Sequence, residues 1–204
     1  MKKQFLIIFT TALLAGCYPD GPDYVEDIDV VYTVYDQAYD FKTQKTFAMP
    51  DKIAVSVEVT SEDTLIEYMN PIYATPILQA IQRNMENYGW SRVNVDQNPD
   101  IVLTPAGLST TTYFYSYWYD WWYGGYWGWY GWYYPPYYTV SSYTTGTLLM
   151  VVADPNQANQ SPINRSPALW IAAANGLLTY SYDLSRVSEG IDQAFTQSPY
   201  LNLK

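Results

Sequence analysis

The stretch GTLLMVVA, residues 146–153, is apolar at every position after Thr147. Successive side chains of a strand point to opposite faces, so an uninterrupted apolar run predicts a central strand that is covered on both faces. Leu169 to Leu178 is expected to form the next strand, after a loop from Pro155 to Pro167. The rest of the chain must therefore supply layers that cover this pair of strands.

Two segments have the periodicity of amphipathic helices. Between Asn70 and Gly89 an apolar residue recurs every three or four positions, and the same spacing returns near the end of the chain, before Ser198-Pro199. Asn70-Pro71 or Thr75-Pro76 can begin the first helix, and Gly89 can end it in the left-handed conformation. The apolar stripes consist of Ile77, Leu78, Ile81, Met85 and Tyr88 in the first helix and Leu184, Val187, Ile191 and Phe195 in the second.

Short runs of β-branched and aromatic residues predict the remaining strands, at Val30–Tyr35, Thr46–Met49, Ile53–Val59 and from Asp100 to Leu103. The order of strands and helices, ββ-α-ββ-α, predicts an α+β fold. We expect a small, mainly antiparallel sheet with two helices on one face, plus a long aromatic β-hairpin insert.

That insert, residues 113–138, reads YFYSYWYDWWYGGYWGWYGWYYPPYY, and Asp120 is its only charged residue. Gly124-Gly125 favours a two-residue hairpin turn, and the resulting register places each inner glycine opposite a tryptophan. Alternation then divides the predicted binding surface between two faces. One face carries Trp118, Trp122, Trp127 and Trp129, and the other carries Tyr117, Tyr119, Trp121, Tyr130 and Trp132.

Eighteen aromatic rings within this insert could bury about 2,700 Å², at about 150 Å² each, whereas the largest apolar patch of a monomer is usually about 300–600 Å². Most of this surface must therefore be covered. Three interpretations remain open: a surface for binding or assembly, a packed part of the core, and a disordered aromatic tract.

The N-terminus has the pattern of a secretory signal peptide, with Lys2 and Lys3 before an apolar run that ends in Leu14-Ala15-Gly16-Cys17. LAGC resembles the lipobox of bacterial lipoproteins, in which cleavage leaves a cysteine that carries acyl chains. Cys17 is the only cysteine of the chain, so no disulfide partner competes for it. We expect a signal peptide at 1–17, an acidic tether at 18–29 and a single domain at 30–204, held to a membrane through Cys17.

Several motifs follow one another along the chain: YDQAYDFKTQKTF at 35–47, Tyr88-Gly89-Trp90 at the end of the first helix, NPDIVL at 98–103, Gly146-Thr147-Leu148 with Asp154, and Trp170. In this order they resemble the bacterial lipoprotein family of domain of unknown function 4136. The resemblance implies a lipid-anchored α+β envelope domain, and the aromatic insert departs from the family pattern.

Charge and composition restrict the function. Without Lys2 and Lys3 the chain has eight basic and twenty acidic residues, a formal charge of −12, which excludes nucleic acid as a partner. There is no histidine, and no G-x-S-x-G, P-loop or G-x-G-x-x-G motif, so we expect no enzyme, no metal and no cofactor.

We therefore expect a non-enzymatic envelope lipoprotein, in the outer membrane of a Gram-negative bacterium, whose aromatic hairpin binds a glycan or an envelope protein. One alternative is a hydrolase that uses a carboxylate pair, such as Asp27 with Asp29, Glu62 with Asp63, or Asp96 with Asp100. Asp36, Asp40 and Asp154 follow strands, where capping of turns explains them equally well. The other alternative is a purely structural domain with the hairpin packed as core.

Overall fold

The computed structural model describes residues 31–59, 64–108, 131–133, 146–160, 165–178 and 183–204. The predicted signal peptide and tether, and all of the aromatic insert except residues 131–133, lie outside these ranges. The same holds for the predicted turn at Gly124-Gly125.

The central strand is β8 (Thr147–Ala153), and all seven of its residues are buried, as predicted. It lies between β6 (Ile101–Leu108) and β9 (Arg165–Ala174) and is antiparallel to both. The edge strand β1 (Val31–Tyr35) adds to β9, again antiparallel. This half of the sheet agrees with the expected pairing.

The other half of the sheet contains parallel pairs, so the prediction of a mainly antiparallel sheet was wrong. β2 (Thr46–Ala48) is parallel to β6, and β5 (Ser91–Arg92) is parallel to β2. β3 (Ala54–Val59) is antiparallel to β4 (Thr64–Tyr68) and meets β6 in parallel. Between β2 and β5 the chain forms the β3–β4 hairpin and a helix, a connection long enough to return it in the same direction. The fold is therefore α+β with a mixed sheet.

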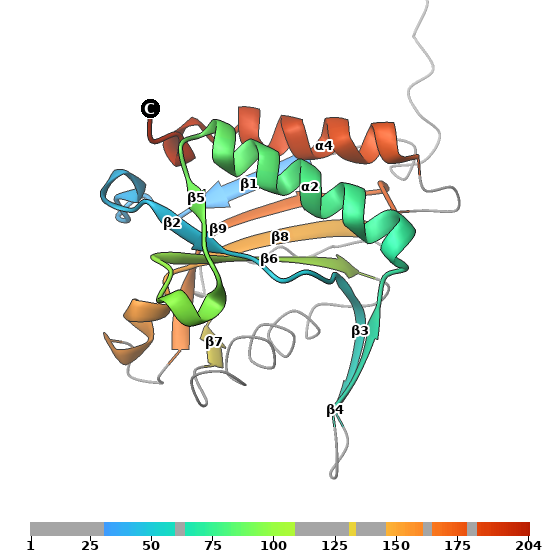
Figure 1. Cartoon of the computed structure of the whole chain (residues 1–204), viewed down its shortest axis with the longest axis horizontal. Coiled ribbons are helices and arrows are strands. Elements are labelled where there is room, and N and C mark those ends of the chain that lie inside the picture. The colour runs from blue at the N-terminus through green and yellow to red at the C-terminus, as the bar shows by residue number, and fades with distance from the viewer. Residues whose placement is uncertain (1–30, 60–63, 109–130, 134–145, 161–164, 179–182) are drawn as a thin grey trace, which may run out of the picture.

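Two helices, α2 (Pro71–Asn87) and α4 (Leu184–Thr196), lie side by side on one face of the sheet, as expected (Figure 1). Asn70 is the N-cap of α2, and its Oδ1 accepts a hydrogen bond of 3.0 Å from the N–H of Ile72. Gly89 follows α2 with φ +96°, the left-handed conformation predicted for it. Asp183 caps α4 through the N–H of Ser185 at 2.9 Å.

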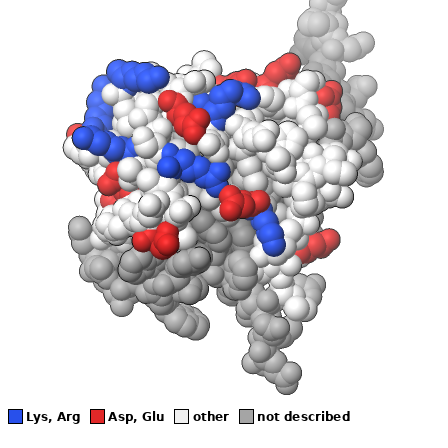
Figure 2. Space-filling model, in the orientation of Figure 1, with Lys and Arg blue, Asp and Glu red and all other residues white. Residues whose placement is uncertain are grey.

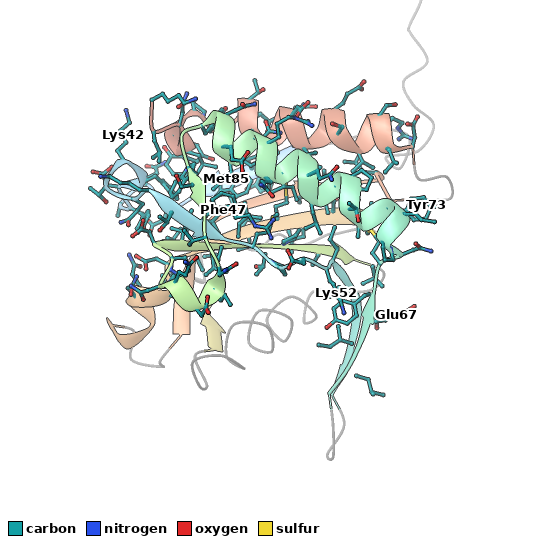
Figure 3. All side chains as sticks on the ribbon, in the orientation of Figure 1. Lys42, Phe47, Lys52, Glu67, Tyr73 and Met85 are labelled. Atoms are coloured by element: carbon teal, nitrogen blue, oxygen red, sulfur yellow. The ribbon has the colours of Figure 1, made fainter. Side chains whose placement is uncertain are left out.

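The larger hydrophobic core fills the layer between these helices and the sheet. Met85 of α2 and Phe47 of β2 both lie in this layer and are fully buried (Figure 3). The opposite face of the sheet is buried as well, although both helices lie on the first face. Its side chains are small or aliphatic and include Ala106, Val102, Leu149, Val151, Ile171 and Ala173.

Two tryptophans hold the segment that follows α4 against the domain. Trp90 donates a hydrogen bond of 2.8 Å from Nε1 to the carbonyl of Leu201, and Trp170 donates one of 2.8 Å to Oγ of Ser198. The N–H of Leu203 bonds to the carbonyl of Tyr88 at 2.8 Å. Tyr88, Trp90 and Trp170, all of them motif residues, therefore bind the same segment, residues 198–203.

Within the described residues, no helix is both long enough and apolar enough to cross a bilayer.

Candidate functional site

The predicted lipidation site and most of the predicted binding surface fall outside the described residues. Of the surface, only Trp132 lies within them, in β7 (Gly131–Tyr133). β7 pairs in parallel with Arg165–Pro167, the first residues of β9 (Figure 1). The residues outside are Cys17, Tyr117, Trp118, Tyr119, Trp121, Trp122, Trp127, Trp129 and Tyr130.

The position of β7 connects the aromatic insert to the centre of the fold. β9 continues from its pairing with β7 into the main sheet, where it lies between β8 and β1. Backbone hydrogen bonds therefore join one short part of the insert to a strand whose residues from Ala168 to Ala174 are buried.

The carboxylates that follow strands act as caps of turns, one of the roles expected for them. Asp36 Oδ1 accepts the N–H of Ala38 at 2.9 Å, and Asp40 Oδ1 accepts that of Lys42 at 3.0 Å. Asp154 Oδ1 accepts the N–H of Asn156 at 2.8 Å. These bonds satisfy backbone donors where the chain turns.

Asp154 also accepts a hydrogen bond from the Tyr39 hydroxyl, which lies 3.1 Å from its Oδ2. Burial raises the pKa of Tyr39, and the nearby negative charge of Asp154 raises it further. The phenol therefore remains protonated and serves as a donor. This pair connects the loop after β1 to the end of β8.

Asp100 holds the start of β2 against the start of β6. Its Oδ2 accepts hydrogen bonds from the N–H of Lys45 at 2.9 Å and from the N–H and hydroxyl of Thr46, both at 2.8 Å. Burial raises the pKa of Asp100, but these hydrogen bonds outweigh it and lower the pKa overall. Its carboxylate therefore stabilises the contact between these two strands.

A polar pocket of about 860 Å³ lies beside β5, and the sequence analysis did not identify it. Its walls come from the loop after β2, from one side of α2 and from the 3₁₀ turn Val95–Gln97 with the residues that lead to it. The residues that line it are Met49, Pro50, Asp51, Gln82, Glu86, Arg92, Val93, Asn94, Val95, Asp96 and Gln97.

Arg92 is the centre of a hydrogen-bonded array in this pocket. Its Nη1 donates to Oε1 of Gln82 at 2.7 Å, and its Nη2 donates to Oδ1 of Asp51 at 2.6 Å and to the carbonyl of Met49 at 3.1 Å. Gln82 in turn donates from Nε2 to Oε1 of Glu86 at 2.7 Å. Three separate elements therefore meet in one continuous polar array.

Sequence reasoning missed this pocket because its parts are distant in the chain and β5 has only two residues. A two-residue strand carries no periodicity that could reveal it. Among the described residues, no group of three or more His, Cys, Asp or Glu side chains is arranged to hold a metal ion.

The mixed sheet with two helices on one face makes this protein an α+β domain, in which the short strand β7 of the aromatic insert pairs with β9. Residues 31–200 match the model of the family described as domain of unknown function DUF4136, and the chain belongs to that family.

The crystal structure of a DUF4136 family protein from Bacteroides thetaiotaomicron is similar to this chain over 87% of its length and over 100% of that protein, with 32% identity and a TM-score of 0.67. A PelC dodecamer from Paraburkholderia phytofirmans matches over 87% of this chain and 99% of that one, at 13% identity and a TM-score of 0.41. Comparison with curated proteins gave no match.

Proposed function

We propose that this chain is a lipid-anchored, non-enzymatic protein of the bacterial cell envelope, and that its aromatic insert, residues 113–138, is the surface that binds a glycan or another envelope protein. The anchor is supported by the LAGC sequence and by the absence of any second cysteine from the chain. Tyr18, the residue after the anchor, lacks the aspartate of an inner-membrane retention signal, which favours the outer membrane.

The described domain begins at the sheet edge with Val31, so thirteen residues, 18–30, separate it from Cys17. A flexible chain of that length has an end-to-end distance of about 20 Å. This distance would let the domain contact partners close to the membrane surface while the acyl chains stay inserted.

The absence of catalysis is supported by what the polar residues do. Asp36, Asp40 and Asp154 cap turns. Asp100 accepts three hydrogen bonds, two from Thr46 of β2 and one from Lys45, the residue before it. The sequence has no histidine to act as a general base.

The observation that carries the binding role is the pairing of β7 with β9. This pairing sets the backbone of residues 131–133 beside Arg165–Pro167, and it supports a surface that is joined to the domain at this point. Tryptophan and tyrosine are enriched at binding hot spots and stack on the apolar faces of sugars.

The anchor is tested with the Cys17→Ser variant in the native host, followed by detergent phase separation, density fractionation of membranes and mass spectrometry of the mature N-terminus. We expect the wild-type chain to carry acyl chains and to sediment with outer membranes, and the variant to lose both properties. Acyl chains on the Cys17→Ser variant, or its sedimentation with outer membranes as for the wild type, would refute the anchor.

The binding surface is tested by two matched variants, one for each predicted face. The first replaces Trp118, Trp122, Trp127 and Trp129 with serine, and the second replaces Tyr117, Tyr119, Trp121 and Tyr130. Each is assayed for thermal unfolding, for binding of purified envelope polysaccharide and for co-purifying proteins. We expect one variant to lose binding with an unchanged Tm; if both lose stability and neither loses binding selectively, the insert is core.

A further inference from the structure

The polar pocket around Arg92 lies where ligands commonly bind in sheets with parallel strands. β2 and β5 are parallel, and the pocket is built from the residues that directly follow each of them, Met49–Asp51 and Val93–Gln97. In open α/β sheets, ligands bind in the crevice outside the carboxyl ends of the strands, and this pocket has the corresponding position relative to β2 and β5. The volume of about 860 Å³ lies within the usual range for ligand pockets, about 300–1,000 Å³.

The guanidinium of Arg92 is fixed in position before any ligand binds. Its side chain is 29% exposed and is held by hydrogen bonds to Gln82 and the Met49 carbonyl, with Asp51, whose side chain is 90% exposed, as a third acceptor. These bonds use three of its five N–H donors, so two remain to point elsewhere. A group held in this way loses little conformational entropy when it binds a ligand.

The other polar residues of the pocket provide both donors and acceptors. Glu86 accepts from Gln82 with Oε1, and a carboxylate has further acceptor positions on its second oxygen. Gln97 accepts the N–H of Asn94 at 2.8 Å with Oε1, a bond that engages its oxygen and not its NH₂ group. Hydroxyl groups donate and accept at once, so a ligand with several of them suits this mixture.

The charges of the pocket favour a ligand without negative charge. Asp51, Glu86 and Asp96 line it together with Arg92 as the only basic residue, which gives a formal charge of −2. Since three carboxylates face a single guanidinium, a phosphate or carboxylate would meet net repulsion. Figure 2 shows basic and acidic side chains interspersed on this side of the molecule, with no extended basic patch.

Met49, Pro50, Val93 and Val95 contribute apolar surface to the same walls. A pyranose ring carries hydroxyls at its rim and C–H groups on its faces, so it combines the two kinds of contact that this pocket offers. A neutral sugar therefore offers hydroxyls for the donors and acceptors of the pocket and carries no negative charge that its carboxylates would repel.

We propose that the pocket at the carboxyl ends of β2 and β5 binds a neutral saccharide of one to a few units, oriented by the array of Arg92, Gln82 and Glu86. This site is separate from the aromatic insert and does not rest on the function proposed for it.

The test uses the full-length chain in a detergent without a sugar headgroup, titrated with neutral trisaccharides of glucose, mannose, galactose and N-acetylglucosamine. Binding is followed by saturation-transfer NMR and by the Nε–H resonance of Arg92. The variant is Gln82→Leu, which breaks the array on the surface of α2. Its matched control is Gln79→Leu, the same change on the same helix, outside this pocket and exposed.

We expect saturable binding of at least one trisaccharide, with a shift of the Arg92 resonance, a loss of about tenfold in affinity for Gln82→Leu and none for Gln79→Leu. The 6-phosphate of the same sugar should bind more weakly. The proposal fails if no trisaccharide binds, if Gln82→Leu binds as the wild type does, or if the phosphorylated sugar binds more tightly. Binding that resists Gln82→Leu but disappears when the tryptophans of the insert are replaced would overturn this site while supporting the aromatic surface.

Discussion

Replacement of Ser198 by alanine should destabilise the domain strongly for so small a change. Ser198 and Trp170 are both fully buried, and the serine hydroxyl accepts the indole N–H at 2.8 Å. The variant would remove that acceptor, and a buried N–H that is left unsatisfied costs about 1–3 kcal/mol. The Tyr200 hydroxyl donates to Ser198 at 3.1 Å and also interacts with the Trp170 side chain, so it offsets part of this cost. We expect a loss of about 2 kcal/mol, which corresponds to a fall in Tm of about 4–8 °C.

The assay is urea denaturation with thermal unfolding, on Ser198→Ala, Trp170→Phe and the double variant. Because Trp170→Phe removes the donor, Ser198→Ala should cost much less in that background, with a coupling of about 1–2 kcal/mol. Ser188→Ala is the control, since Ser188 makes only a bond of 3.4 Å to Arg83 at an exposed site and should change stability by less than about 0.5 kcal/mol. A Ser198→Ala variant as stable as this control would refute the reasoning.

Three further predictions concern other contacts. Hydrogen bonds lower the pKa of Asp100 although burial raises it, so its ionised form stabilises the fold above the unfolded value of 3.8, and this contribution is lost as the pH falls through the lower folded pKa. The stability difference between wild type and Asp100→Asn in urea should therefore be full at neutral pH and shrink below about 3.8; a difference independent of pH would contradict this. Gly190→Ala should lower Tm despite the better helix propensity of alanine, because the added Cβ would lie 2.5 Å from Cδ1 of Leu177. Combined with Leu177→Ala it should lower Tm by less than the two single changes together, and simple additivity would count against the clash. Tyr39→Phe should lower the free energy of unfolding by about 1–2 kcal/mol, because it removes the hydroxyl that donates to Asp154, a residue only 7% exposed. An unchanged midpoint in urea denaturation would show that water replaces this hydroxyl.

The elements that were predicted correctly are those whose signal is local. α2 follows from its apolar stripe with Asn70 and Gly89 at its ends, and the buried β8 follows from an unbroken apolar run. β4 was missed, although Ile66 and Tyr68 pack on the sheet while Leu65 and Glu67 are exposed, the alternation typical of a strand.

Parallel pairing could not be predicted in the same way. The two parallel partners of β2 are both far from it in the chain, and β5 is too short to leave a pattern. The pocket around Arg92 exists only because this pairing brings Asp51, Gln82 and Arg92 together. The capping aspartates were predictable, because each acts on a backbone group two residues further on.

The strand order has a consequence for the time at which the domain can fold. Val31 of β1 pairs with Ala174 of β9, 143 residues later in the chain, and β9 also completes the environment of β8. Such distant pairing makes folding slow, because the entropy of closing a long loop is lost before the contacts of the paired strands stabilise the fold. A nascent chain cannot complete this sheet before residues 165–174 have been synthesised. Until then β1 lacks its partner and β8 lacks one of its two neighbours, so the topology itself delays folding until most of the chain has been made.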